Sequence, residues 1–345
     1  DFFMTCDNQF GFKKNHGCSH AIYTLRRVAE HYTSSGSTVN ICALDLSKAF
    51  DKMNHCGLFI KLMKRSVPLN LLSLLEYWFS ICFTCIKWNS CFSGYFQLVC
   101  GIRQGGVLSP YLFALYIDDV IEKVKLFPNG CFVNFISLSI IMYADDILLI
   151  APSVTSLQHL VNICEHELKL LDMAINAKKS MCIRIGSRFN AVCAAITIGN
   201  GLQLQWSDSI RYLGILIVKS RTFKCTFKHA RAAFYRSFNT VFGRIGRIAK
   251  ENVVVEILQK KCLPVLLYAT EVCPMTKSDI DGLRFAVNNA LMKIFDTKCK
   301  DVVETCAYIF GLSDISVIIA NRKSSFDKQF CMTDNLLYKS VGLYT

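Results

Sequence analysis

The sequence lacks several patterns that would set it apart from ordinary globular proteins. It has no repeat period or low-complexity tract, and its first residues do not follow the order of a secretory signal peptide. Its 18 cysteines are scattered singly through apolar stretches. This distribution excludes a disulfide scaffold and predicts buried free thiols in a reducing compartment. The Cys-x-x-Cys of Cys82 and Cys85 has no partner pair at zinc-finger spacing, so we expect it in the core.

Acidic residues are scarce relative to basic ones. The chain has 26 Asp and Glu against 39 Lys and Arg, and its formal net charge is +13. Such a surface attracts polyanions, among which nucleic acid and acidic membrane are the usual candidates. Hydrophobic residues make up 52% of the 345 residues, which is enough to bury one or two cores. This composition excludes a disordered or collagen-like chain.

The longest apolar stretch, residues 131–151, is long enough to cross a bilayer, but it contains Asp145 and Asp146. Each carboxylate would cost about 2.5 to 3.5 kcal/mol at the centre of a membrane helix. Two short apolar strands that meet at an acidic turn explain the same residues without that cost. We therefore expect a hairpin here and no interaction with membrane.

Hydrophobic periodicity predicts an α+β region followed by a helical one. The expected helices cover residues 22–32, 69–79, 110–124 and 157–171, and the expected strands cover 39–46, the hairpin around 145 and short runs within 181–218. From residue 224 onward the pattern is helical and basic, with Lys or Arg at positions 224, 228, 231, 236, 244, 247 and 250.

Carboxylates follow apolar strands at two separate places. Asp145 and Asp146 lie between residues 140–142 and 147–150, which are all apolar, and Asp45 ends the apolar run of the first strand. If the strands are neighbours, three carboxylates converge, and hard oxygen ligands of this kind bind Mg²⁺ together with phosphates. Two such ions about 3.5 to 4 Å apart can support an in-line displacement. The alternative is an ordinary turn with solvated aspartates.

Three segments together resemble motifs A, B and C of reverse transcriptases. They are residues 45–51 (DLSKAFD), 101–110 (GIRQGGVLSP) and 143–146 (YADD). Residues 9–14 (QFGFKK), 176–180 (NAKKS) and 211–214 (RYLG) look like further blocks of the non-LTR, LINE-type branch. The resemblance covers roughly residues 8–300 and implies a right-hand polymerase of α+β class, with an antiparallel palm sheet packed on helices. Viral RNA-copying polymerases usually carry Gly where Ala144 stands.

The resemblance implies a role for each matching residue. Asp45 and Asp145 would hold two Mg²⁺ ions, with Mn²⁺ as a substitute, and Asp146 would be the weaker, supporting carboxylate. Lys179 or Lys178 would protonate the departing pyrophosphate, and the sequence leaves open which.

The remaining roles concern nucleotide, template and primer. Phe50 would be the steric gate that favours deoxynucleotides, although it is also a candidate core aromatic. Residues near the nucleotide and template would be Arg103, Gln104, Gly105 and Lys178, and the primer grip would be Tyr212, Leu213 and Gly214. The partners implied are an RNA template, a DNA primer and deoxynucleoside triphosphates.

By the same resemblance, residues 1–38 are partial fingers, 39–222 the palm, 223–300 a thumb and 301–345 a C-terminal tail. We expect a truncated or decayed copy, or a fragment, without the endonuclease and the first fingers segment. Two functions stay open, an RNA-directed DNA polymerase and an inactive remnant that only binds nucleic acid. Either would be intracellular, in cytoplasm and nucleus.

Overall fold

A central, mostly antiparallel sheet organises the chain in the computed structural model, which describes residues 2–103, 105–199, 201–246, 248–333, 335 and 337. The sheet has six strands in the order β11-β12-β10-β1-β9-β8, and only the β10–β12 pair is parallel. The strands are β1 (Thr38–Leu44), β8 (Ile140–Tyr143), β9 (Asp146–Ala151), β10 (Met181–Gly186), β11 (Ile196–Thr197) and β12 (Gln203–Trp206).

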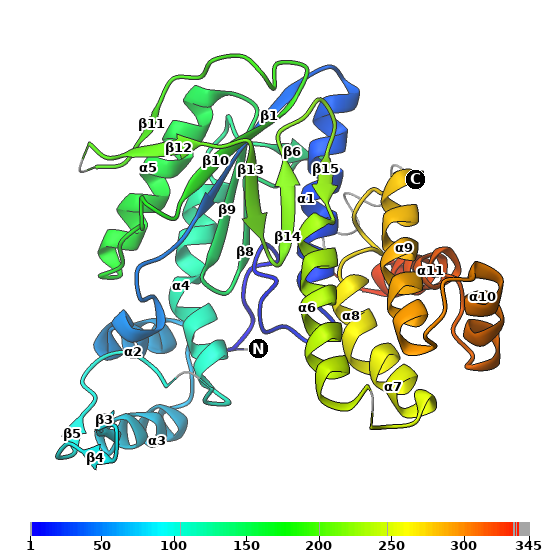
Figure 1. Cartoon of the computed structure of the whole chain (residues 1–345). Coiled ribbons are helices and arrows are strands. Elements are labelled where there is room, and N and C mark those ends of the chain that lie inside the picture. Colours follow the sequence, from blue (N-terminus) through cyan, green and yellow to red (C-terminus); the bar gives the residue numbers. More distant parts are fainter. Residues whose placement is uncertain are drawn as a thin grey trace.

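The sheet is apolar on both faces, because alternate residues of its central strands enter two different cores. In β1, Val39 and Ile41 join one core, and Cys42 and Leu44 join the other. Helix α1 (Cys18–Ser34) packs on the first face, and α4 (Ser109–Lys125) and α5 (Val154–Leu170) cover the second (Figure 1). This double covering explains why β1, β9 and β10 read as nearly continuous apolar runs in the sequence.

An excursion between β1 and α4 extends away from the sheet, at the lower left of Figure 1. It begins with the 3₁₀ turn η1 (Phe50–Lys52), followed by α2 (His55–Lys64) and α3 (Leu69–Ser80). Two small ribbons complete it, one formed by β2 (Phe83–Thr84) with β5 (Phe96–Gln97), the other by β3 (Lys87–Trp88) with β4 (Cys91–Phe92). A third ribbon, β6 (Phe132–Val133) with β7 (Ile136–Ser137), precedes β8.

After the main sheet, the chain forms a small sheet and then a helical region. The sheet contains β13 (Ser209–Tyr212), β14 (Ile215–Val218) and β15 (Lys224–Thr226). The helical region contains α6 (Lys228–Ile245), α7 (Glu251–Ile257), the π-helical turn η2 (Leu258–Cys262), α8 (Leu263–Leu266), α9 (Lys277–Ile294), α10 (Lys300–Ile309) and α11 (Ile315–Met332).

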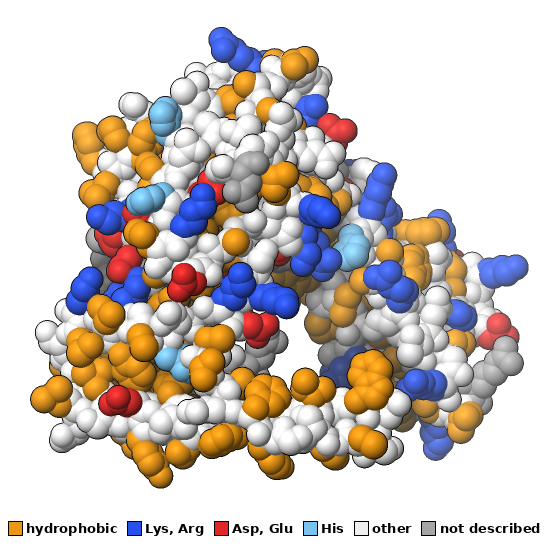
Figure 2. All heavy atoms as spheres, turned by 90° about the vertical axis from the view of Figure 1, so that its left-hand side faces the viewer, with side chains coloured by type: hydrophobic (Ala, Val, Ile, Leu, Met, Phe, Trp, Pro, Cys, Tyr) orange, Lys and Arg blue, Asp and Glu red, His pale blue; other side chains and the backbone are white. Residues whose placement is uncertain are grey.

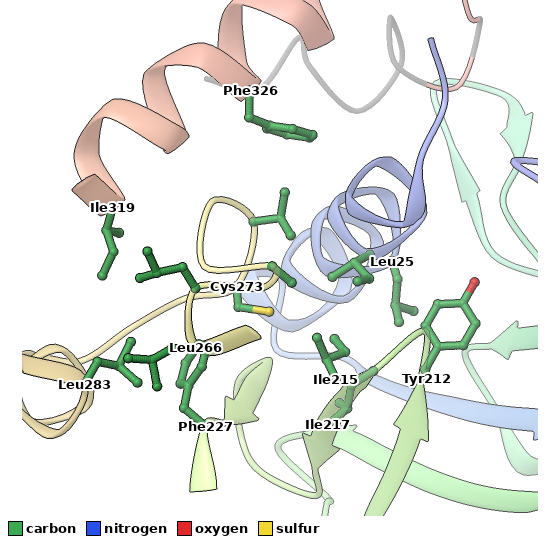
Figure 3. Packing of buried hydrophobic residues seen from close by; sticks show 14 of the residues in the cluster. Leu25, Tyr212, Ile215, Ile217, Phe227, Leu266, Cys273, Leu283, Ile319 and Phe326 are labelled. Atoms are coloured by element: carbon green, nitrogen blue, oxygen red, sulfur yellow. The ribbon is translucent and has the colours of Figure 1, made fainter. Parts of the chain in front are cut away.

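The helical region shares its core with the first face of the main sheet. Figure 3 shows Leu25 of α1, Ile215 of β14 and Leu266 of α8 pointing into one apolar interior. Phe326 of α11 belongs to the same cluster. The helices are therefore packed directly against α1 and the small sheet, not joined to them only by a linker.

Most of the elements predicted from the sequence are confirmed, with two corrections. Lys224 lies on β15, and the helical pattern begins only at Lys228. All 18 cysteines are free, but burial was wrongly predicted for most of them, including Cys82 and Cys85, which are half-buried at the periphery. Among the described helices, none has both the length and the apolarity needed to cross a membrane.

Candidate active site

Strand register brings the three aspartates to one edge of the main sheet. Strands β1 and β9 are antiparallel, and their last pair is Leu44 with Ile147. One further step in this register sets Asp45 opposite Asp146. Asp145 precedes Asp146 in the turn that joins β8 to β9, so all three carboxylates lie where these strands end. The convergence expected from the sequence therefore follows from ordinary backbone pairing.

The β8–β9 turn is short and holds a residue in an unfavourable conformation. Tyr143 pairs with Asp146, which leaves only Ala144 and Asp145 in the loop. Ala144 has φ +59°, whereas Asp145 is not in the left-handed region. A positive φ at the first loop residue is typical of a type II′ hairpin turn, which normally prefers glycine there. Alanine at this position is strained, as is common at functional sites.

The side chain of Gln9 is hydrogen-bonded to this turn. Its Oε1 accepts hydrogen bonds from the backbone amides of Ala144, at 3.1 Å, and of Gly11, at 3.0 Å. Gln9 is fully buried. A Cβ on Gly11 would lie 2.6 Å from the amide nitrogen of Ala144, so only glycine permits this approach. The sequence marked residues 9–14 only as a family block, and it gave no sign of this contact.

The peptide groups around Asp45 are fixed by the segment that precedes β10. The Asp45 amide donates to Ser180 Oγ at 3.1 Å, and the Asn176 amide donates to the Asp45 carbonyl at 2.8 Å. Lys179 Nζ lies 3.8 Å from Asp45 Oδ2. Lys178 is exposed and forms no ion pair with any described residue. Of the two lysines, Lys179 therefore has its charge beside the carboxylates.

Asp145 and Asp146 have raised pKa values, as expected of acids held close together. Burial, with a smaller contribution from Asp45, raises the pKa of Asp145. Burial and the charges of Asp145 and Asp45 raise the pKa of Asp146 to about 6. Raised acid pKa values mean that the nearby positive charge does not balance the carboxylates.

Carboxylate oxygens are the ligands that Mg²⁺ prefers, so the donor chemistry of this edge fits a divalent cation. Within the described residues, however, no three His, Cys, Asp or Glu side chains are close enough together to hold a metal ion as they stand. The structure thus places the acids at one edge without gathering their oxygens.

The loop after β5 is attached to the segment that follows Asp45. The Gly101 amide donates to the Met53 carbonyl at 2.8 Å, and the Ile102 amide donates to the Phe50 carbonyl at 2.9 Å. Gly101 has φ +78°, and a Cβ on it would lie 2.7 Å from the Asp51 carbonyl oxygen. Glycine is therefore required where motifs A and B meet.

Other predicted nucleotide contacts are placed as follows. Phe50 is half-buried and stacks on Phe113 of α4, with ring centroids 4.4 Å apart. This contact is the packing expected of a core aromatic. The Arg103 guanidinium donates to the Phe83 carbonyl at 2.8 Å. Gly105 is exposed with φ +86°, and Gln104 lies outside the described residues.

The predicted primer grip is the turn between β13 and β14. Leu213 and Gly214 form the two-residue loop, and both have positive φ. The Tyr268 hydroxyl donates to the Leu213 carbonyl at 2.8 Å. Tyr212 is only 3% exposed, burial raises its pKa, and its hydroxyl has no hydrogen-bond partner among the described residues. In Figure 3 its ring lies at the margin of the shared core, so only the loop itself can meet a ligand.

The sequence of this region has a match among known protein families. The family described as "Reverse transcriptase (RNA-dependent DNA polymerase)" matches residues 4–217, more than half of the chain. The chain therefore belongs to the reverse transcriptase family, and the α+β polymerase fold expected from the sequence is confirmed with it.

The relatives with similar sequences are polymerases of non-LTR retrotransposons, the branch expected from the sequence. The "RNA-directed DNA polymerase from mobile element jockey" of Drosophila funebris is 26% identical over 301 residues, which cover 83% of this chain and 31% of the relative. The "Retrovirus-related Pol polyprotein from type-2 retrotransposable element R2DM" of Drosophila melanogaster is 25% identical over 63% of this chain and 21% of the relative. The chain thus spans about a third or less of these relatives.

Among solved structures, telomerase from Candida Tropicalis in complex with a fragment of telomeric RNA gives a TM-score of 0.47 at 12% identity. The alignment covers 95% of this chain and 52% of that one.

Replacing Gln9 by Leu should loosen the β8–β9 turn. The amides of Ala144 and Gly11 would lose their acceptor, and a buried unsatisfied amide costs about 1 to 3 kcal/mol. We expect a lower unfolding free energy in urea and faster hydrogen exchange at the Ala144 amide. The control is Gln205→Leu on the exposed side of β12, which should change neither. An unchanged exchange rate at Ala144 would contradict the supporting role of Gln9.

Replacing Asp146 by Asn should stabilise the metal-free protein at neutral pH. Because its pKa is about 6 when folded and about 3.9 when unfolded, the folded state binds this proton more tightly. The cost of the charge therefore appears as pH rises through this interval. The variant should gain at most about 1 kcal/mol at pH 7, since the carboxylate is only partly removed from water, and almost nothing near pH 4. Urea unfolding at both pH values measures this, and an equal gain at both would refute it.

Proposed function

We propose that this chain is an RNA-directed DNA polymerase of a non-LTR retrotransposon, which extends a DNA primer on an RNA template. The observation that supports this most is the β1–β9 register, which sets Asp45 beside Asp145 and Asp146 in a member of the reverse transcriptase family. The expected domain limits, 1–38, 39–222, 223–300 and 301–345, are part of the proposal, as is a location in cytoplasm and nucleus.

Asp45 and Asp145 would hold two Mg²⁺ or Mn²⁺ ions, with Asp146 in support. When bound, such ions activate the attacking hydroxyl and stabilise the charge of the leaving group. The protein contributes a rigid edge, because Asp45 is held through its peptide groups and Asp145 through the turn on Gln9. Lys179 lies beside Asp45 and is the better placed of the two lysines to donate a proton to pyrophosphate.

The nucleotide would lie between this edge and the loop after β5. Arg103, Gln104 and Gly105 would contact nucleotide or template, Lys178 would add charge, and Phe50 would crowd a ribose 2′-hydroxyl. The Tyr212–Gly214 turn would meet the primer through its exposed loop. All these assignments rest on the motif resemblance.

The duplex would be held mainly through its phosphates by the helical region. Strand β15 and helix α6 carry Lys224, Lys228, Arg231, Arg236 and Arg244. Such contacts give affinity without reading the sequence, and they weaken steeply with salt.

A second candidate function is that of an inactive remnant that binds nucleic acid only. It is favoured by the finding that no three ligating side chains are gathered among the described residues. The basic surface would serve this function equally well, so binding alone does not separate the two candidates.

Replacing Asp145 by Ala should abolish primer extension, with a loss of at least about 100-fold, because the carboxylate acts on the transition state. Duplex affinity and melting temperature should stay close to those of the original protein. The control is Asp208→Ala, since Asp208 is 92% exposed and paired with Lys219 away from the edge. If the unmutated protein extends the primer and the Asp145→Ala variant extends it equally well, Asp145 is not part of the catalytic site. No extension by the original protein would favour the remnant.

Replacing Phe50 by Val should raise incorporation of ribonucleotides relative to deoxynucleotides, because the smaller side chain leaves room for a 2′-hydroxyl. The ratio of the two single-nucleotide rates is the measurement. Phe59→Val is a matched control, since Phe59 is also half-buried against the same core. An equal loss of both rates would instead indicate that Phe50 acts through packing against Phe113.

A further inference from the structure

The two ribbons beyond α3 carry an unusual number of exposed aromatic rings. We name residues 83–97 the aromatic ribbon. Its rings belong to Phe83, Trp88, Phe92, Tyr95 and Phe96, and their exposures are 50%, 78%, 66%, 80% and 46%. Exposed apolar groups that lie together usually mark a contact surface. Scattered single rings would need no explanation, but these occupy one short segment.

The aromatic ribbon has no core of its own. Its strands are two residues long, and most of its side chains are exposed. It lies at the far end of the excursion, on the opposite side of the molecule from helices α6 to α8 (Figure 1). In Figure 2, which views this side, hydrophobic side chains gather over the lower part of the face. The rings are therefore available to a partner.

The composition of the segment fits a partner that has flat apolar groups and no need of a positive counterpart, since exposed rings are abundant and acids that would repel a nucleic acid are absent. From residue 77 to residue 117 the sequence has no Asp or Glu, and its only charged residues are Lys87 and Arg103. Lys87 Nζ lies 5.4 Å from the centroid of the Phe92 ring. Rings interleaved with a few cations, without acids, are the composition of surfaces that bind single-stranded nucleic acid.

The aromatic ribbon is continuous with the loop proposed to contact the template. Arg103 of that loop is hydrogen-bonded to the Phe83 carbonyl at 2.8 Å, and the Leu98 amide donates to the Cys82 carbonyl at 2.8 Å. The same loop is attached through Gly101 to Met53, close to motif A. An RNA strand that approaches the catalytic edge along this loop therefore passes the aromatic ribbon first.

We propose that the aromatic ribbon is a stacking platform for unpaired bases of the RNA template before they reach the catalytic edge. This inference rests on the proposed function, because it takes the template as the partner. Every base has a flat face, so stacking on Trp88 and Tyr95 holds RNA of any sequence. With only two cations nearby, most of this affinity is insensitive to salt, in contrast to the phosphate contacts of α6.

The test compares the whole chain with its Trp88→Ala/Tyr95→Ala variant in binding, without nucleotide or metal. One probe is a DNA primer paired to RNA with a single-stranded 5′ RNA extension, and the other is the same duplex with blunt ends. We expect the variant to lose at least about 10-fold affinity for the extended probe and none for the blunt one. The extra affinity given by the extension should change little with salt.

Two controls separate stacking from folding. Trp88→Phe/Tyr95→Phe keeps flat rings and should retain most of the affinity for the extension. Tyr308→Ala removes a ring that is 85% exposed on α10, and it should have no effect. Circular dichroism and melting temperature should be the same for all variants.

Three outcomes would overturn the inference. The first is an equal loss of affinity for both probes, and the second is no loss of affinity for either. The third is unchanged RNA binding in a variant that binds phosphatidylserine vesicles less or self-associates less, which would indicate a membrane or a second copy as the partner. The binding comparison does not depend on catalysis. A chain that binds the extension as expected but never extends a primer would refute the proposed activity and leave the platform standing.

Discussion

The antiparallel register between β1 and β9 is the constraint on which the candidate site depends. Side chains alternate between the two faces of a strand, so a slip of one residue would move Asp45 away from Asp146 and exchange the two cores. That slip is opposed by both faces at once, because Val39 and Ile41 fill one core while Cys42 and Leu44 fill the other. The hydrophobic interior thus fixes the position of the polar edge, and the acids need no direct contact with one another to be placed.

The candidate site contains several groups that each destabilise the folded state. Ala144 adopts a positive φ, the acids have raised pKa values, and Gln9 Nε2 is buried without a partner among the described residues. A hydrogen bond from each of two amides to the Gln9 oxygen offsets part of this. These groups meet at the β8–β9 turn, although residues with positive φ also occur elsewhere, for example Lys48 and Ala269. Backbone strain beside a candidate site is common at functional sites.

Much of the site could be predicted from the sequence, because its signals are local. An apolar strand that ends in Asp45 and an apolar hairpin with Asp145 at its tip follow from hydrophobic pattern alone, and the motif order gave the family. Other features depend on contacts between distant segments. The Gln9 support joins residues 135 positions apart. The preference for Lys179 over Lys178 depends on how the chain approaches β10, and the burial of Tyr212 depends on helices that pattern could not position. Burial of cysteines was overestimated because a thiol is tolerated in either environment.

The hydrogen bond between Tyr268 and Leu213 has a mechanical consequence. Tyr268 lies two residues after the end of α8, and its ring lies against Gly214, where an added Cβ would approach it to 2.9 Å. Any translation of α8 relative to the small sheet must therefore break this bond or carry the β13–β14 turn along. The shared core beneath makes the second outcome the less costly one. The β13–β14 turn and the helices that pack against it are therefore expected to move together as one unit.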